Sequence, residues 1–287
     1  SFLPMLVGFG CTVPAVDATR TLDNERDRIV TALIAPFRRC GARLPVYVLR
    51  GSIFFPSNAG TVTFIMYLLG IVVALILGLV LRGTVLPATA SGPTIMEMPQ
   101  YRMPTVRTIT LHTWTRTKAF LKEAGTVIFA TMMVVWLLMA IPLSGDGGFA
   151  DTDVNDSAFA TIADVVSPVF EPAGFGTWEA TGSLMTGFVA KEVVIGTMAQ
   201  AYGGDEEDES TLYEPIRESF EESSGGNAAL AAFAFMVFVL LYTPCMAAVG
   251  AIRGEIGAKW MWFSIINQFA IAWTGAVLVF QVGRFLG

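Results

Sequence analysis

Histidine and cysteine are scarce in this sequence of 287 residues. His112 is the single histidine, which argues against a histidine-rich metal site and against a Ser-His-Asp triad. The three cysteines include no CxxC pair, so neither a disulfide framework nor a thioredoxin-like centre is expected. Two nucleotide-binding motifs are also missing, the GxxxxGK[S/T] loop and the GxGxxG turn. The sequence therefore shows no catalytic constellation and no familiar nucleotide site.

Charged residues are few, and apolar residues dominate. Hydrophobic residues make up 54% of the sequence, and the mean hydropathy is +0.60. This composition predicts an all-α, polytopic membrane helical bundle rather than a soluble domain. Thr61 to Leu81 and Ala124 to Leu143 contain no charge and are each long enough to span the hydrocarbon layer. The opening Ser1-Phe2-Leu3-Pro4 has no positive leader, so we expect the middle of a longer protein rather than a signal peptide.

Hydrophobicity and chain breaks together predict about six crossing or half-crossing elements. Counted with the broken ones, the segments are Phe2 to Ala18, Cys40 to Phe55, Thr61 to Leu81, Ala124 to Leu143, Gly182 to Tyr202, Ala228 to Gly250 and Lys259 to Phe285. The second segment contains Arg43 and Arg50, which either snorkel to an interface or line the protein interior.

One short pattern occurs twice in the chain. Ala-Val-x-Ala-x-Arg is found in Gly10-Cys11-Thr12-Val13-Pro14-Ala15-Val16-Asp17-Ala18-Thr19-Arg20 and in Thr243-Pro244-Cys245-Met246-Ala247-Ala248-Val249-Gly250-Ala251-Ile252-Arg253. Proline removes a backbone donor and clashes with the preceding turn, so Pro14 and Pro244 predict interrupted helices with freed carbonyls. In a bilayer such groups persist only inside protein or beside a wet cavity. Paired interruptions in two halves of a membrane protein indicate a substrate site near the midplane.

The distribution of Lys and Arg predicts the side of each loop. Basic residues cluster at Arg20 to Arg39 and at Arg82 to Lys122, which should be cytoplasmic, whereas none lies between Lys122 and Lys191. The loop Ser144 to Ala180 should therefore face outward. Counting crossings from it places the acidic loop around Asp205 inside and Arg253 outside. The two copies of the pattern would then be antiparallel, as inverted repeats containing broken helices.

The expected organisation has three parts. Residues 1–82 hold the carboxyl-terminal part of the first repeat and a membrane helix, 83–107 a Pro-rich cytoplasmic linker, and 108–287 an amphipathic helix, the second repeat and the last membrane helix. In Arg107 to Glu123, apolar and basic residues are interleaved as in a helix lying on the membrane. A simple cytoplasmic extension of the following span explains that pattern equally well. The acids, mainly in Asp146 to Glu179 and Asp205 to Glu222, are interpreted as solvated loops.

Cys11 and Cys245 are the first candidate ligands. Thiolates suit Fe(II), Zn(II) or Cu(I) and select against Mg(II) and Ca(II), although a single cysteine is often a small buried hydrophobe. Their place at the two breaks favours the ligand role, because backbone carbonyls and the Thr12 or Thr243 hydroxyl could complete a transient coordination shell. Thioether sulfur could come from Met246 and Met5, while Cys40, in another interrupted stretch, is either a third ligand or structural.

Charged groups in apolar surroundings are functional candidates because their burial is costly. Lys191 and Glu192 lie within such a stretch, where Glu192 could be a hard oxygen ligand and Lys191 could reach a partner; alternatively, both sit near a helix end. Asp17 follows the first break and either attracts a cation or caps a helix. Pro14, Pro244, Asp17 and Lys191 are thus the candidate pathway or gating residues.

At these residues the chain resembles the membrane portion of FeoB-type ferrous iron transporters, with its two Gate repeats. The matching stretches occur in order over nearly the whole length and are Val7-Gly8-Phe9-Gly10-Cys11-Thr12-Val13-Pro14-Ala15, Arg20-Thr21-Leu22-Asp23-Asn24-Glu25-Arg26-Asp27-Arg28, Cys40-Gly41-Ala42-Arg43-Leu44-Pro45-Val46-Tyr47, Met96-Glu97-Met98-Pro99-Gln100-Tyr101-Arg102-Met103-Pro104, His112-Thr113-Trp114, Ala190-Lys191-Glu192-Val193-Val194 and Leu241-Tyr242-Thr243-Pro244-Cys245. The family usually has Asn where this chain has Thr12, and the acidic loop around Asp205 resembles a lineage-specific insertion.

The resemblance implies Fe(II) uptake across a bacterial or archaeal cytoplasmic membrane, with Cys11 and Cys245 lining the path. It implies that GTP and Mg act only through a G domain that this chain lacks, in the same or a separate polypeptide. A small cytoplasmic Feo accessory protein and a homo-oligomer are further implied partners, besides the lipid bilayer; nucleic acid is not. Two alternatives stay open, a nucleoside-type carrier on related gate repeats and a membrane thiol oxidoreductase.

Overall fold

The fold is known from a computed structural model that describes residues 4, 10–22, 24–37, 40–84, 105–142, 157–191, 193–202 and 212–286. These residues form helices and no β-strand; one isolated antiparallel bridge joins Pro142 and Ser157. In chain order the elements are α2 (Thr12–Asp17), η1 (Ala18–Thr21), α3 (Glu25–Ile34), η2 (Ala35–Phe37), η3 (Gly41–Arg43), α4 (Leu44–Phe54), α5 (Ala59–Thr84), α6 (Val106–Ala140), α7 (Ala158–Val166), η5 (Ser167–Ala173), α8 (Trp178–Val189), α9 (Val193–Ala201), α10 (Tyr213–Ser224), α11 (Ala228–Leu241), α12 (Met246–Ile256) and α13 (Ala258–Leu286).

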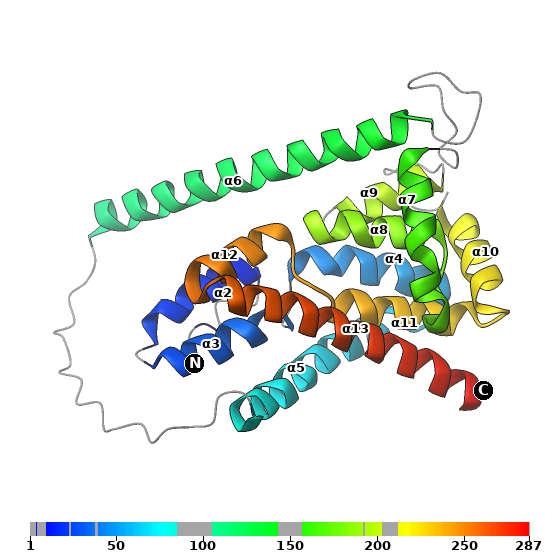
Figure 1. Ribbon diagram of the computed structural model, residues 1–287, viewed down its shortest axis with the longest axis horizontal. Helices are drawn as coiled ribbons and strands as arrows, with labels where there is room; N and C mark the ends of the chain where they lie inside the picture. Colours follow the sequence, from blue (N-terminus) through cyan, green and yellow to red (C-terminus); the bar gives the residue numbers. More distant parts are fainter. Residues whose placement is uncertain are drawn as a thin grey trace.

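The helices form an elongated bundle (Figure 1). Helices α2, α3 and α12 gather at one end, and α7 and α10 lie at the other. Three helical stretches are long and apolar enough to cross a membrane, Ala59–Gly83, Ala228–Ile256 and Ala258–Phe285. Large apolar side chains point outward from them, such as Phe64 and Leu79 on α5 and Ile266 on α13, as suits a lipid environment. The prediction of an all-α membrane helical bundle is confirmed.

The core is built around α11, whose residues from Phe235 to Leu241 are all buried. Aromatic rings pack along it edge to face: Phe175 lies 5.3 Å from Phe235, and Phe170 lies 5.2 Å from Phe238, between ring centroids. Helix α13 runs antiparallel to α11, because an added Cβ on Gly275 would lie 3.2 Å from Leu241 while Gly283 abuts Leu230. Residues of α4 and α5 join the same core, so it draws on both parts of the chain separated by the linker.

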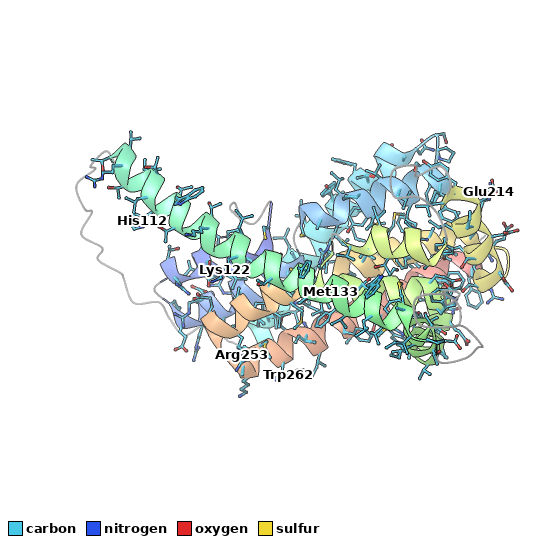
Figure 2. All side chains as sticks on the ribbon, turned by 90° about the horizontal axis from the view of Figure 1, so that it is seen from above. His112, Lys122, Met133, Glu214, Arg253 and Trp262 are labelled. Carbon is cyan, nitrogen blue, oxygen red and sulfur yellow. The ribbon has the colours of Figure 1, made fainter. Side chains whose placement is uncertain are left out.

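Helix α6 contains the expected span Ala124 to Leu143 up to Ala140 and continues without a break back to Val106. The extension interpretation of Arg107 to Glu123 therefore fits the structure. Its 35 residues measure roughly 52 Å at 1.5 Å per residue, well beyond a hydrocarbon core of about 30 Å. His112 lies on the part that projects beyond the neighbouring helices (Figure 2). Most of the linker, residues 85–104, lies outside the described residues.

The expected crossing Gly182 to Tyr202 is wrong, because these residues form a helical hairpin. Thr197 Oγ1 donates to Thr186 Oγ1 at 3.0 Å, and an added Cβ on Gly187 would lie 2.5 Å from Val194 Cγ2. A continuous helix would separate residues 186 and 197 by roughly 16 Å. Helices α8 and α9 are therefore antiparallel, and the chain returns to the end from which it entered. No Gly or Pro lies between Phe188 and Val193, so the sequence carries no turn signal there.

This hairpin changes the sides assigned to the later loops. Asp205 itself lies outside the described residues, but the flanking Tyr202 and α10 lie at the same end as Gly174, whose carbonyl oxygen accepts a hydrogen bond from Ser223 Oγ at 3.3 Å. At the opposite end, an ion pair joins Arg20 to Glu255, two residues after Arg253. The expectation that Arg253 lies on the opposite side from Arg20 is therefore wrong. An inverted relation of the two copies depended on those opposite sides, so it loses that support.

The short α4 also differs from a full crossing. It has 11 residues and a length of roughly 16 Å, about half the hydrocarbon thickness. It is a half-crossing element within the bundle. Arg43 and Arg50 line the protein interior, with exposed fractions of 2% and 0%, so the second of the two interpretations of these arginines is confirmed.

Candidate functional site

The two copies of the repeated pattern meet in the fold. Ala15 and Val16 of α2 pack with Ile252 of α12 in one buried cluster. Beyond them, Arg20 Nε and Nη2 both reach the Glu255 carboxylate, and this hydrogen bond and charge raise the pKa of Arg20. The pattern predicted a relation between these segments, and the structure shows that they are in direct contact.

Each cysteine of the two copies is the N-cap of the helix that follows it. Cys11 has extended backbone angles before α2, and Cys245 precedes α12; neither thiol forms a capping hydrogen bond. Between α11 and α12, Tyr242 to Cys245 is non-helical, which confirms an interruption at Pro244. Pro14 is different, because it lies in the first turn of α2, where a missing backbone donor is tolerated. Helix α2 therefore begins at Thr12, and Pro14 does not break it.

Cys40 lies beside the same region. Gly41 N donates to Gly10 O at 3.1 Å, which joins the chain next to Cys40 to the chain next to Cys11. Arg43, three residues after Cys40, donates to Tyr242 O at 3.5 Å, and Cys245 follows Tyr242 by three residues. The three cysteine-bearing segments thus converge near the second break, and the cysteines form no disulfide. Within the part of the chain that the structure describes, no three His, Cys, Asp or Glu side chains are grouped as metal ligands.

The hairpin tip approaches this break from the other side. Lys191, between α8 and α9, is 3% exposed, and its Nζ lies 4.4 Å from the centroid of the Tyr242 ring. Gly187 permits the contact, because an added Cβ would lie 2.5 Å from Tyr242 Oη. Glu192 and Met5 lie outside the described residues.

The other candidates occupy varied environments. Thr12 and Thr243 are buried, whereas Met246 is 43% exposed at the start of α12. Asp17 is the last residue of α2 and precedes η1 without a side-chain capping hydrogen bond, so the capping interpretation is wrong. It lies within electrostatic range of Arg20.

Sequence reasoning gave no site role to the two buried arginines of the second segment, and one of them, Arg43, contacts the break. Arg43 Nη2 donates to Pro36 O at 3.4 Å and to Tyr242 O at 3.5 Å, so it satisfies one carbonyl freed by the break. Arg50 lies between two rings, 4.0 Å from the Phe220 centroid and 4.3 Å from the Phe235 centroid. The signal that could have identified them is the presence of two arginines in an otherwise apolar segment.

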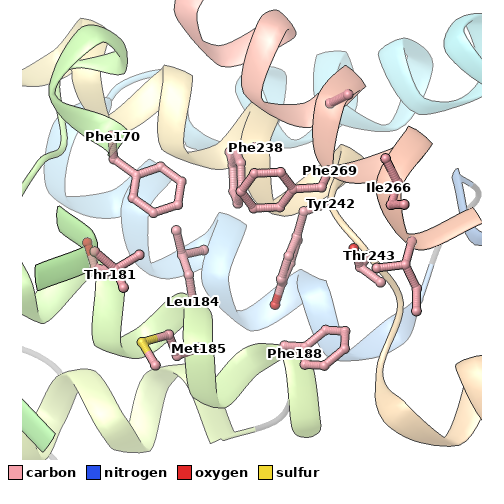
Figure 3. A pocket seen from close by; sticks show the side chains of 13 residues that line it. Phe170, Thr181, Leu184, Met185, Phe188, Phe238, Tyr242, Thr243, Ile266 and Phe269 are labelled. Carbon is pink, nitrogen blue, oxygen red and sulfur yellow. The ribbon is translucent and has the colours of Figure 1, made fainter. Parts of the chain in front are cut away.

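An apolar cavity of about 570 Å³ lies next to the break, between α8 and α13 (Figure 3). Phe170, Phe188, Phe238 and Phe269 line it, together with Tyr242 and Thr243. The Tyr242 hydroxyl points toward α8 near Phe188. The cavity wall has few polar atoms. The cysteines, Lys191 and Arg43 are not among the residues that line it.

Two family models match the chain. The model described as nucleoside recognition (Gate) matches residues 121–259, and the model described as ferrous iron transport protein B C terminus matches residues 63–116. No solved structure matches the chain.

Curated relatives match almost the entire sequence. The Fe(2+) transporter FeoB of Staphylococcus aureus (strain MSSA476) is 38% identical over 285 residues, covering 99% of this chain and 41% of the relative. The Fe(2+) transporter FeoB of Escherichia coli (strain K12) is 37% identical over 329 aligned residues, covering 99% and 42%. The chain thus spans about two fifths of the length of these relatives. The resemblance inferred from the sequence is confirmed: over nearly its whole length, this chain matches the carboxyl-terminal membrane part of FeoB-type proteins.

Proposed function

We propose that this chain is the membrane permease portion of an Fe(II) uptake system in a bacterial or archaeal cytoplasmic membrane, crossing it several times. The observation that carries the proposal is the convergence of three cysteine-bearing segments at the break between α11 and α12. The names of the relatives support Fe(II) as the transported ion. Fe(II) would exchange hydration water for thiolate, hydroxyl and carbonyl ligands along a path past this break, with Cys11 and Cys245 as the first soft donors and Cys40 as a further one.

The remaining candidates take supporting roles in this proposal. Thr243 is buried beside Cys245 and would contribute a hydroxyl, while Glu192 would contribute a carboxylate. Lys191, Asp17, Pro14 and Pro244 would shape the path or its gate. The three expected parts, 1–82, 83–107 and 108–287, remain our assignment of the two Gate repeats and the linker.

Control would come from outside these residues. GTP and Mg would bind a G domain in the same or a separate chain, and that domain would act through the end that carries α2, α3 and α12. The basic residues at this end and along the start of α6 favour the cytoplasmic side for it. A small cytoplasmic Feo protein and a second copy of the chain are the other proposed partners.

The test is Fe(II) flux into proteoliposomes. Replacing both Cys11 and Cys245 with Ser keeps the size and removes the soft ligands, so we expect a flux loss of roughly 10- to 100-fold. Cys40→Ser alone should cause a smaller loss. Met246→Leu tests the thioether, with Met133→Leu on the exposed side of α6 as its matched control. Undiminished flux in the double variant would remove the thiols from the mechanism.

A further inference from the structure

The face of the Tyr242 ring holds a cation, the ammonium of Lys191. Tyr242 ends α11 immediately before the break and is buried, with 3% of its surface exposed. The ammonium of Lys191 lies 4.4 Å from the ring centroid, which is the geometry of a cation–π contact. We call this face of the Tyr242 ring the cation seat.

The cation seat adjoins the proposed ligands. Cys245 follows Tyr242 by three residues, and Arg43, three residues after Cys40, donates to Tyr242 O at 3.5 Å. A metal ion held by these thiols would lie near the ammonium, and both Tyr242 and Lys191 are buried. Like charges repel strongly across such a distance when the surroundings have a low dielectric constant. Lys191 in its observed position and a divalent ion at the thiols therefore disfavour one another.

The hairpin is suited to move this charge. Lys191 lies at the tip, and the turn around it is short, since Val193 N donates to Ala190 O at 3.1 Å. The hairpin contacts Tyr242 closely only because Gly187 has no side chain. A lysine side chain adds a compact charge on a flexible stem, which can leave the ring without unfolding α8 or α9.

We propose that Lys191 is a tethered competitor for the transported cation. Its ammonium occupies the cation seat when no metal is bound, and it withdraws when a divalent ion reaches the thiols. This inference rests on the proposed function. It adds the identity of the cation that occupies the site when no metal is bound, which is the Lys191 ammonium. It makes Lys191 a residue that sets the affinity of the site without ligating the metal.

The first experiment titrates the whole chain in lipid nanodiscs with Co(II). Thiolate ligation of Co(II) produces a sulfur-to-cobalt charge-transfer band, which reports binding at the cysteines. Lys191→Met keeps the side-chain length and removes the charge, so Co(II) should bind at least about tenfold more tightly. Lys191→Arg keeps a positive charge and should bind as the unmodified chain does. Lys259→Met, at an exposed lysine on α13, is the matched control and should also leave the affinity unchanged.

The outcomes separate the two proposals. Equal Co(II) affinity in the unmodified chain and in Lys191→Met, with the charge-transfer band present in both, would overturn the competitor role and leave the thiol site standing. Absence of the band in every variant would contradict the proposed function itself.

A second experiment needs no variant and so avoids any folding defect. An amine-acylating reagent followed by mass spectrometry measures the accessibility of each lysine. Lys191 should react slowly without metal, because it is buried, and faster when Co(II) is bound. Lys259 should react equally in both conditions. An unchanged rate at Lys191 while the charge-transfer band shows bound metal would refute withdrawal of the ammonium.

Discussion

Single buried side chains hold the second break in place. Arg43 comes from the first part of the chain, yet one of its nitrogens bonds the carbonyl of Tyr242 from the second part and that of Pro36 from its own. Carbonyl groups freed by a helix break are costly when left without donors. A guanidinium supplies several donors in a fixed plane and so can serve two carbonyls.

Replacing Arg43 with Met should lower the free energy of unfolding by about 2 kcal/mol or more, because two buried carbonyls lose a donor. Lys at this position should restore only part of the loss, since an ammonium lacks the planar fork. Denaturant unfolding in detergent measures both variants. Arg253→Met, at an exposed arginine of α12, should have little effect. Equal stability of Arg43→Met and Arg253→Met would show that the two hydrogen bonds contribute nothing.

Glu179, in the first turn of α8, is expected to make stability depend on pH. Partial burial raises the pKa of Glu179, and the charges of Glu222 and Asp164 add to the effect. Together with Glu171, these carboxylates surround a pocket of about 520 Å³. A raised folded-state pKa means that the folded protein binds the proton more tightly, so stability falls as the pH rises from the ordinary carboxyl pKa through the folded value.

Glu179→Gln should therefore be more stable than the unmodified chain at neutral pH, and the difference should shrink in acid. Thermal unfolding of both proteins across the acidic range measures it. Glu218→Gln, at an exposed position on α10, is the matched control and should show no such trend. A stability difference independent of pH would contradict the role of the Glu179 proton.

At the scale of elements, the hairpin of α8 and α9 decides how the second half is arranged. Its close packing depends on Gly187, where an added Cβ would lie 2.5 Å from both Tyr242 Oη and Val194 Cγ2. The side chains of Tyr242 and Val194 cannot move aside freely, because both residues are buried.

Gly187→Ala should destabilise the fold by about 1–3 kcal/mol through overpacking. Gly250→Ala is its control: α12 offers open space there, and Ala should stabilise the helix slightly. Unfolding in detergent compares the two. Should Gly187→Ala be as stable as Gly250→Ala, the hairpin does not pack on Tyr242 as described.

Sequence reasoning succeeded where burial in lipid dominates. Thr61 to Leu81 and Lys259 to Phe285 are long apolar runs, and they match α5 and α13 closely. It failed at Lys191, because the sequence around this turn has no Gly or Pro and resembles the middle of a helix that carries two charges. That single error reversed the assigned side of every later loop.

The site was predictable only in part. The repeated pattern and Pro244 identified Cys11, Cys245 and a chain break. The partners that surround the break depend on tertiary packing: Arg43 reaches Tyr242 across 199 residues of sequence, and Lys191 reaches it from the hairpin. No local spacing encodes such contacts.

At the scale of the whole molecule, the end with α2, α3 and α12 holds both arginines and acids, whereas carboxylates gather at the end with α7 and α10. Arg253 and Glu214 lie toward opposite ends of the bundle (Figure 2). Arg20 lies at the same end as Arg253, because it forms an ion pair with Glu255 on the same helix, α12. The carboxylates around the pocket of about 520 Å³ lie at the end with α7 and α10. From the positive-inside rule we expect the end with α2 and α12 to face the cytoplasm.

Cysteine labelling with a membrane-impermeant maleimide tests this arrangement, in a background with Ser at positions 11, 40 and 245. Cysteines at the exposed residues Glu171 and Glu218 should label from one side of the membrane. Those at the exposed residues Thr21 and Arg253 should label from the other. Labelling of Arg253→Cys together with Glu171→Cys would restore the side that the count of crossings gave to Arg253.

The second break is tied to the first part of the chain at two levels. The Arg20–Glu255 ion pair joins the segment after α2 to the carboxyl-terminal end of α12. Arg43 donates a hydrogen bond to the carbonyl oxygen of Tyr242, where α11 ends. A rearrangement of α12 would have to give up the ion pair, and a movement of the break itself would have to give up the Arg43 hydrogen bond. We therefore expect α2 and α12, the helices that follow Cys11 and Cys245, to move together as one rigid unit.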